Sequence, residues 1–267
     1  MASPGATFVS ELAKQTDNQV TDLQAKLKDQ QQIQRFLVSL AERLRDERHS
    51  EALKVLATSK KQLELLGKTY PESATQIEAL AAELRALAEA TVDDLPRTFP
   101  AEIQTAGLTL DPSSRHPKYT LLDEFIEVRF NKAKLESTVL PRDGRKIVLG
   151  IEPKTVVARL ASEVDRLTGR PFEPRTFLSM LSNAYRAVSA EVGAGSGENI
   201  PLKQLVAELA KDKDFRADEF NVDLSRFVRD KESSGKVSLD NARDAKKGVL
   251  LWELDERGYY GYIRMEG

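Results

Sequence analysis

The sequence contains no cysteine and only two histidines, His49 and His116. The lack of cysteine excludes a disulfide framework, a thiolate metal site and a cysteine nucleophile. Neither histidine has a second ligand or catalytic partner at a suitable spacing in the sequence. We therefore expect no metal centre and no cofactor.

A strong net charge and long hydrophobic runs are also missing. The 267 residues include 40 Lys and Arg against 42 Asp and Glu, and the net charge of -2 gives no field over the whole molecule that would attract DNA. No apolar run approaches the roughly 18 residues that a membrane helix needs. Residues 1–5 have neither the basic nor the apolar part of a signal peptide. We expect a soluble, cytoplasmic protein that does not contact a membrane.

The first ninety residues have the periodicity of amphipathic helices. Apolar residues spaced by three and four predict one long helix over residues 20–44, with a polar interruption at residues 30–32. Further helices are expected over residues 50–67 and from Pro71, because proline is tolerated in a first helical turn. Residues 1–95 are therefore predicted to form a helical or coiled-coil assembly domain, which packs within one chain or joins copies into an oligomer.

Four prolines lie in residues 96–118 and predict a linker without helix. Residues 119–195 are expected to form an α+β region. Its alternating residues 126–131 predict a half-buried strand, although residues 121–126 would also suit a helix. Asp143–Gly144, between two apolar runs, predicts a hairpin with a type I′ turn.

Helices over residues 155–167 and 175–192 are expected to follow this hairpin, and glycines end both of them. The remainder, residues 196–267, then has the pattern of a short extended piece, two helices and a closing hairpin. The fold class predicted for the whole chain is α+β and mostly helical. Its N-terminal part is a helical hairpin or coiled coil, and its C-terminal part contains β-hairpins.

The order of elements near the C-terminus resembles a winged helix-turn-helix domain. The residues that carry the likeness are 200–205 at the start of the second helix, 217–229 in the third helix, and 248–265 as the wing. The resemblance implies that the third helix enters the DNA major groove and that the wing contacts the backbone. The helical region before it makes the whole chain similar in architecture to accessory subunits of SMC-type DNA-handling complexes.

Basic residues gather at the tip of the middle hairpin, before the wing, and on the third helix. The candidate DNA-binding residues are Arg142, Arg145, Lys146, Arg226, Arg229, Arg243, Lys246, Lys247 and Arg257. Acidic residues on the third helix nearly cancel its basic ones, although phosphate neutralisation supplies much of the affinity for DNA. This balance favours an alternative in which the domain contacts only proteins.

No catalytic group stands out. Asp143, Glu152 and Lys154 have the order of a metal-dependent nuclease motif, but a turn at Asp143 would put the two acids about 30 Å apart along one strand. The sequence thus predicts a non-enzymatic accessory or adaptor subunit of a nucleic-acid-handling complex, which binds DNA non-specifically and partners through its helices. The alternatives are a pure protein scaffold and, as a lesser one, a nuclease.

Overall fold

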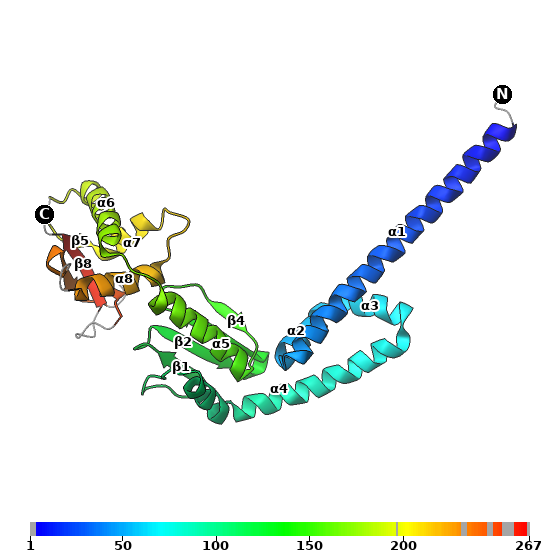
Figure 1. The fold of residues 1–267 in the computed structure, drawn as a ribbon, viewed down its shortest axis with the longest axis horizontal. Helices are drawn as coiled ribbons and strands as arrows, with labels where there is room; N and C mark the ends of the chain where they lie inside the picture. Colours follow the sequence, from blue (N-terminus) through cyan, green and yellow to red (C-terminus); the bar gives the residue numbers. More distant parts are fainter. Residues whose placement is uncertain (1–3, 196, 231–233, 245–247, 253–258, 266–267) are drawn as a thin grey trace. The chain divides into compact units, whose positions relative to one another are not determined.

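The structure is a computed structural model, and it describes residues 4–195, 197–230, 234–244, 248–252 and 259–265. The fold is α+β and mostly helical, as the sequence predicts (Figure 1). It divides into two compact units, and each is described by itself. The first unit is Met1–Asp93 with Gly150–Glu152, and the second is Asp94–Leu149 with Pro153–Gly267.

The first unit is helical. It contains α1 (Pro4–Arg45), α2 (His49–Thr58), α3 (Lys60–Thr69) and most of α4 (Pro71–Thr105). The long first helix and the start of α4 at Pro71 are confirmed. The expected second helix is two helices, because the chain leaves the helical conformation at Ser59. The N–H of Ser59 still donates to the carbonyl of Val55 at 3.0 Å, so a single residue separates the two helices.

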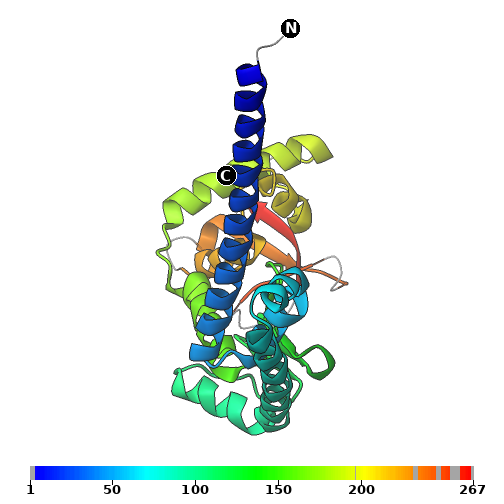
Figure 2. The same cartoon turned by 90° about the vertical axis from the view of Figure 1, so that its right-hand side faces the viewer.

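The core of the first unit lies around the C-terminal part of α1. Phe36 and Leu40 of α1 pack with Ala52 and Leu56 of α2 and with Leu84 of α4. Toward its N-terminus α1 extends beyond α2 and α3 (Figure 2). Most of the stability of this unit therefore comes from one half of its longest helix.

The prediction of a non-helical linker after residue 95 is wrong for its first part, because α4 continues through Pro96 and Pro100 to Thr105. Leu95, Phe99 and Ile103, each at most 1% exposed, repeat every four residues on one face of this segment. The free energy gained by burying that face exceeds the cost of the backbone hydrogen bonds that the two prolines remove.

The second unit contains two antiparallel sheets and the helices that pack on them. The first sheet has the order β1-β2-β3-β4, and the second has β8 between β5 and β6, with β7 also pairing with β8. The strands are β1 (Lys118–Leu121), β2 (Ile126–Asn131), β3 (Glu136–Pro141), β4 (Ile147–Leu149), β5 (Ile200–Pro201), β6 (Val237–Asn241), β7 (Val249–Leu250) and β8 (Tyr259–Met265). The helices are α5 (Pro153–Val164), α6 (Pro174–Val192), α7 (Leu202–Leu209) and α8 (Ala217–Arg229), with a π-helical turn, η2 (Asp165–Gly169), after α5.

The alternation of residues 126–131 predicted β2 with its observed bounds, and the helical alternative for residues 121–126 is wrong. Between β1 and β2 the chain turns through three residues with positive φ, Leu122, Asp123 and Glu124. The carboxylate of Asp111 accepts the backbone N–H groups of Asp123 at 3.1 Å and of Glu124 at 2.7 Å. These contacts hold the turn and stop helix formation there.

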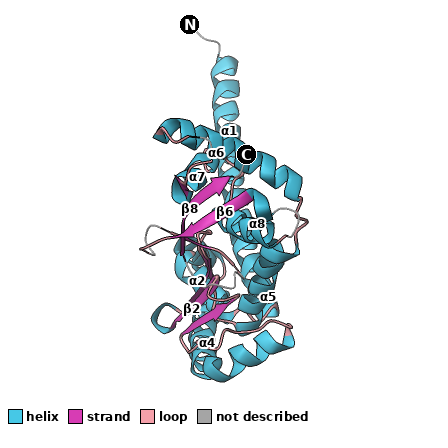
Figure 3. Ribbon diagram, turned by 90° about the vertical axis from the view of Figure 1, so that its left-hand side faces the viewer, coloured by secondary structure: helices cyan, strands magenta, loops and turns pink. Residues whose placement is uncertain are grey.

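The C-terminal core is built by α6, α7, α8 and the second sheet (Figure 3). Phe177 and Leu181 of α6 pack with Phe220 and Phe227 of α8, so the expected domain boundary after residue 195 cuts through this core. Strand β6, which pairs with β8 along most of its length, was not predicted from the sequence. No helix among the described residues combines the length and hydrophobicity needed to cross a bilayer.

We expect Phe99→Ala to lower the free energy of unfolding by about 3–5 kcal/mol, because the ring is fully buried against Tyr119 and Phe130. Urea denaturation measures this loss. The exposed Arg97, two residues earlier, is the control, and Arg97→Ala should leave the free energy of unfolding almost unchanged. An equally small loss for Phe99→Ala would mean that the segment is a linker after all.

Candidate nucleic-acid interface

Helix α8, the third helix of the predicted winged-helix pattern, is buried on two faces. One face, with Phe220, Leu224 and Phe227, belongs to the C-terminal core. On the other side Asn221 and Ser225 are at most 1% exposed. A helix enclosed in this way has no free face to lay in a DNA groove. Any DNA contact of this region therefore has to come from other elements.

The second face of α8 is covered by the end of α5 and by η2, through a buried ion-pair network. The guanidinium of Arg166 in η2 donates to Glu163 at 2.7 Å, to Asp218 at 2.5 Å and to Glu219 at 2.6 Å. The side chains of Glu163 and Asp218 are only 3% and 1% exposed. Burial disfavours the charge of Arg166, but the hydrogen bonds to these carboxylates outweigh it and raise the pKa of Arg166 above its ordinary value.

A second set of contacts uses Arg226, one of the predicted DNA-binding residues. Its guanidinium donates to the carbonyl of Arg170 at 3.2 Å and to that of Thr168, and it lies 3.7 Å from Asp223. Burial raises the pKa of Asp223, and Arg170, at 2.5 Å, opposes this rise. Arg226 is therefore used inside the protein, and we leave it out of the candidate interface.

Arg229, the other basic candidate on α8, lies with its guanidinium 5.5 Å from the ring centroid of Trp252. This is cation–π distance. The aromatic residues of the closing hairpin thus have two different uses. Trp252 contacts Arg229, and Tyr260 packs against the C-terminal core.

The hairpin tip between β3 and β4 is docked against α8 and β8. Arg142 lies 5.4 Å from the ring centroid of Tyr259 and donates to its hydroxyl. The side chain of Asn221 in α8 donates to Asp143 at 3.0 Å. A Cβ at Gly144 would lie 2.7 Å from a carboxylate oxygen of Asp218, so glycine is required for this close approach.

Strands β3 and β4 form the hairpin predicted around Asp143–Gly144, but the predicted type I′ turn is wrong. Asp143 has a positive φ of 57°, whereas Gly144 has none. The N–H of Gly144 donates to the carbonyl of Pro141 at 3.0 Å, and the strands pair only from Val139 and Ile147 onward. Contact with α8, rather than local turn chemistry, sets the shape of this tip.

The basic segment before the predicted wing meets the hairpin tip at Tyr259. The N–H of Ala242 donates to the carbonyl of Tyr259 at 2.5 Å, and Arg243 follows directly. Arg243 is exposed, as are Arg145 and Lys146 on the hairpin. We call Arg142, Arg145, Lys146 and Arg243 the basic face. The candidates Lys246, Lys247 and Arg257 lie outside the described residues.

Sequence reasoning missed the ion-pair network that organises this region. In the sequence, Asp218, Glu219 and Asp223 were interpreted as cancelling the basic charges of a DNA-facing helix, whereas each pairs with an arginine from η2 or its neighbourhood. The only signal in the sequence was the spacing of Arg166 and Arg170, which are four residues apart at the end of a predicted helix. Their long-range partners were not visible in the sequence.

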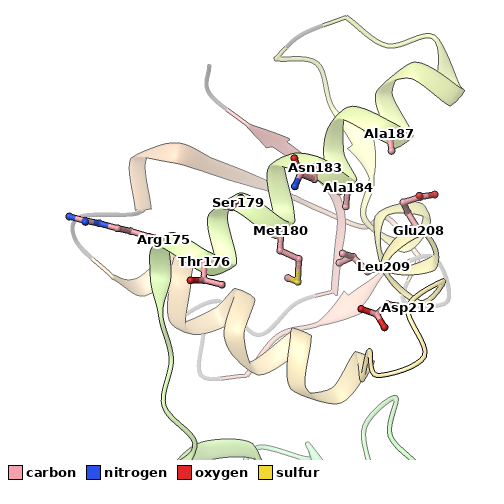
Figure 4. A pocket seen from close by; sticks show the side chains of 10 residues that line it. All are labelled: Arg175, Thr176, Ser179, Met180, Asn183, Ala184, Ala187, Glu208, Leu209 and Asp212. Carbon is pink, nitrogen blue, oxygen red and sulfur yellow. The ribbon is translucent and has the colours of Figure 1, made fainter.

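A groove of about 800 Å³ lies between α6 and α7 (Figure 4). Met180 and Leu209 line it, and Arg175 stands at one end. Glu208 and Asp212 stand on the α7 side. Two carboxylates against one guanidinium do not favour a phosphate ligand.

The residues of the nuclease alternative have structural contacts. In the first unit, Glu152 accepts the backbone N–H of Ser50 at 2.6 Å and its hydroxyl at 2.8 Å. A carboxylate at this position favours the N-terminus of α2. Within the part of the chain that the structure describes, no three acidic or histidine side chains gather as metal ligands.

No model of a known protein family matches this sequence, and no curated protein or solved structure matches it either. The assignment of a role therefore depends on the geometry described above.

Arg166→Met should lower the free energy of unfolding by up to about 3 kcal/mol, because the buried Glu163 and Asp218 would lose the guanidinium that they share and keep one other arginine each. Chemical denaturation at neutral pH measures the change. The matched control is Arg186→Met on the exposed side of α6, for which less than about 1 kcal/mol is expected. A small loss for both variants would contradict the role given to the network.

Proposed function

We propose that this protein is a non-enzymatic accessory or adaptor subunit of a nucleic-acid-handling complex. In this proposal the basic face binds the DNA backbone without sequence preference. The observation that carries it is the meeting of two basic segments, about a hundred residues apart in the sequence, at Tyr259. Basic residues indicate a DNA-binding surface when they cluster on one face of a protein.

The order of elements in the C-terminal core supports a winged-helix relationship for this region. Helices α6, α7 and α8 are accompanied by β5, and β5 pairs with β8, which in turn pairs with β6. Because α8 is enclosed, reading of base edges by that helix is not part of the proposal. Contacts with phosphates through Arg145, Lys146 and Arg243 suit binding by charge and shape.

The groove between α6 and α7 favours a second candidate function, that of a protein scaffold without DNA contact. Its apolar floor with Met180 and Leu209, and its acidic side with Glu208 and Asp212, fit a peptide segment that carries apolar and basic side chains. The two functions predict opposite results in a DNA-binding experiment.

The test is a salt titration of duplex binding with the double variant Arg145→Glu and Lys146→Glu. Both side chains are exposed, so the fold should persist. Arg142 is left unchanged because it contacts Tyr259. We expect affinity to fall at least about tenfold, and the slope of log K against log salt to fall by about 2, as two phosphate contacts are lost. Fluorescence anisotropy with a labelled duplex measures both.

The control reverses two equally exposed charges in α3, Lys60→Glu and Lys61→Glu, and should bind like the unchanged protein. Equal weakening in both double variants would show only an effect of net charge. No binding of the unchanged protein even at low salt would exclude the DNA function of the isolated chain and favour the scaffold.

A further inference from the structure

The N-terminal half of α1 carries an apolar stripe that stays open to solvent. Leu12, Leu23 and Leu27 are 51%, 64% and 60% exposed, and Val20 lies among them on the same face. Val20, Leu23 and Leu27 have the three-and-four spacing of a helix-packing seam, and Leu12 lies eight residues before Val20 on the same side of the helix. A row of large exposed apolar side chains marks a surface that another element covers.

The same face of α1 continues into a groove of the first unit. Gln30, Gln34 and Leu37 extend the three-and-four spacing, and they form one wall of a groove of about 670 Å³. Tyr70 and Ile77, next to the turn between α3 and α4, belong to the facing wall. Leu37 and Tyr70 remain 38% and 47% exposed there. One helix thus presents an uncovered stripe and, further along, an open groove.

We propose that a second copy of this chain covers both, with the two α1 helices antiparallel and crossing near Leu27. One two-fold axis at this position would place the stripe of each copy in the groove of the other, so a single contact satisfies both surfaces. Leu27 would then face the second copy's Leu27, and Val20 would lie level with the second copy's Gln34. The proposal stands independently of the DNA-binding function.

The antiparallel direction of the two α1 helices follows from what is packed around each half of α1. The half with the stripe is a single helix, whereas residues 33–44 are already packed with α2, α3 and α4. A parallel pair would bring the packed bundles of the two copies to the same level. An antiparallel pair places the slender half of one copy beside the groove of the other.

The charges on α1 suit the antiparallel direction. Asp17 and Arg35 are 18 residues apart, which is five whole helical turns, so they lie on the same flank of the stripe. With the crossing near Leu27, Asp17 of each copy comes close to the level of Arg35 in the other. Two opposite-charge pairs result. A parallel pair would set like charges at the same level.

The absence of native cysteine makes a clean cross-linking test possible. In the full-length chain, Leu27→Cys should form an interchain disulfide on mild oxidation, because residue 27 meets its own copy. Thr16→Cys should not, since the two copies of residue 16 would lie about 33 Å apart along the helix axis. Efficient cross-linking through residue 16 would indicate a parallel pair and overturn the proposal.

Light scattering with size-exclusion chromatography provides the second readout. The unchanged protein should have the mass of two chains, and the variant Leu23→Glu with Leu27→Glu should show a twofold lower mass. Both residues are largely exposed, so the monomer should keep its helix content by circular dichroism. The matched control adds the same charges on the opposite side of α1, as Asn18→Glu with Ala25→Glu, and should remain a dimer. A monomeric unchanged protein, or a dimer that survives Leu23→Glu with Leu27→Glu, would overturn the proposal.

Discussion

Two carboxylates that are almost completely buried, Glu163 and Asp218, are bridged by the guanidinium of Arg166. Buried charges are tolerated only when they are paired and hydrogen-bonded. This requirement ties η2 to α8 and thereby joins the two sheets of the second unit. The docking of the hairpin tip follows from it, because Gly144 approaches Asp218 and Asp143 accepts from Asn221 of α8.

The same constraint decides which surface is available for nucleic acid. Because α8 is enclosed, the helix that the winged-helix resemblance points to is not free, and Arg226 is used in internal contacts. Docking of the tip in turn brings Arg142 to Tyr259, whose carbonyl accepts the N–H of Ala242, the residue before the exposed Arg243. The proposed role is thus a consequence of how α8 is packed, and the self-association that we propose uses a separate surface, in the first unit.

Local patterns predicted much of this fold. The alternation of residues 126–131 gave β2, and the glycine after residue 192 gave the end of α6, where Gly193 has a positive φ of 70°. Errors arose where distant contacts override local preference. The helix persists through Pro96 because the neighbouring Leu95 and Phe99 are buried, and Asp143–Gly144 adopts a different turn because α8 lies against it.

For the candidate site, the sequence indicated the basic segments but not their meeting point. Their proximity depends on the contact between Arg142 and Tyr259, which are 117 residues apart. Acidic residues on α8 were interpreted only as weakening DNA binding, because their partners Arg166 and Arg170 come from outside this helix. Ion pairs between residues that are distant in the sequence produce no regular spacing from which they could be predicted.

The central claim is that the hairpin tip and the segment after β6 form one basic face. The most direct measurement is the distance between spin labels at Arg145→Cys and Arg243→Cys in the otherwise cysteine-free chain, diluted with unlabelled protein so that only distances within one chain are seen. We expect a single, narrow distribution at short distance, unchanged by the addition of duplex DNA. A broad distribution centred at long distance would show that the two basic segments do not share a face, and it would contradict this account.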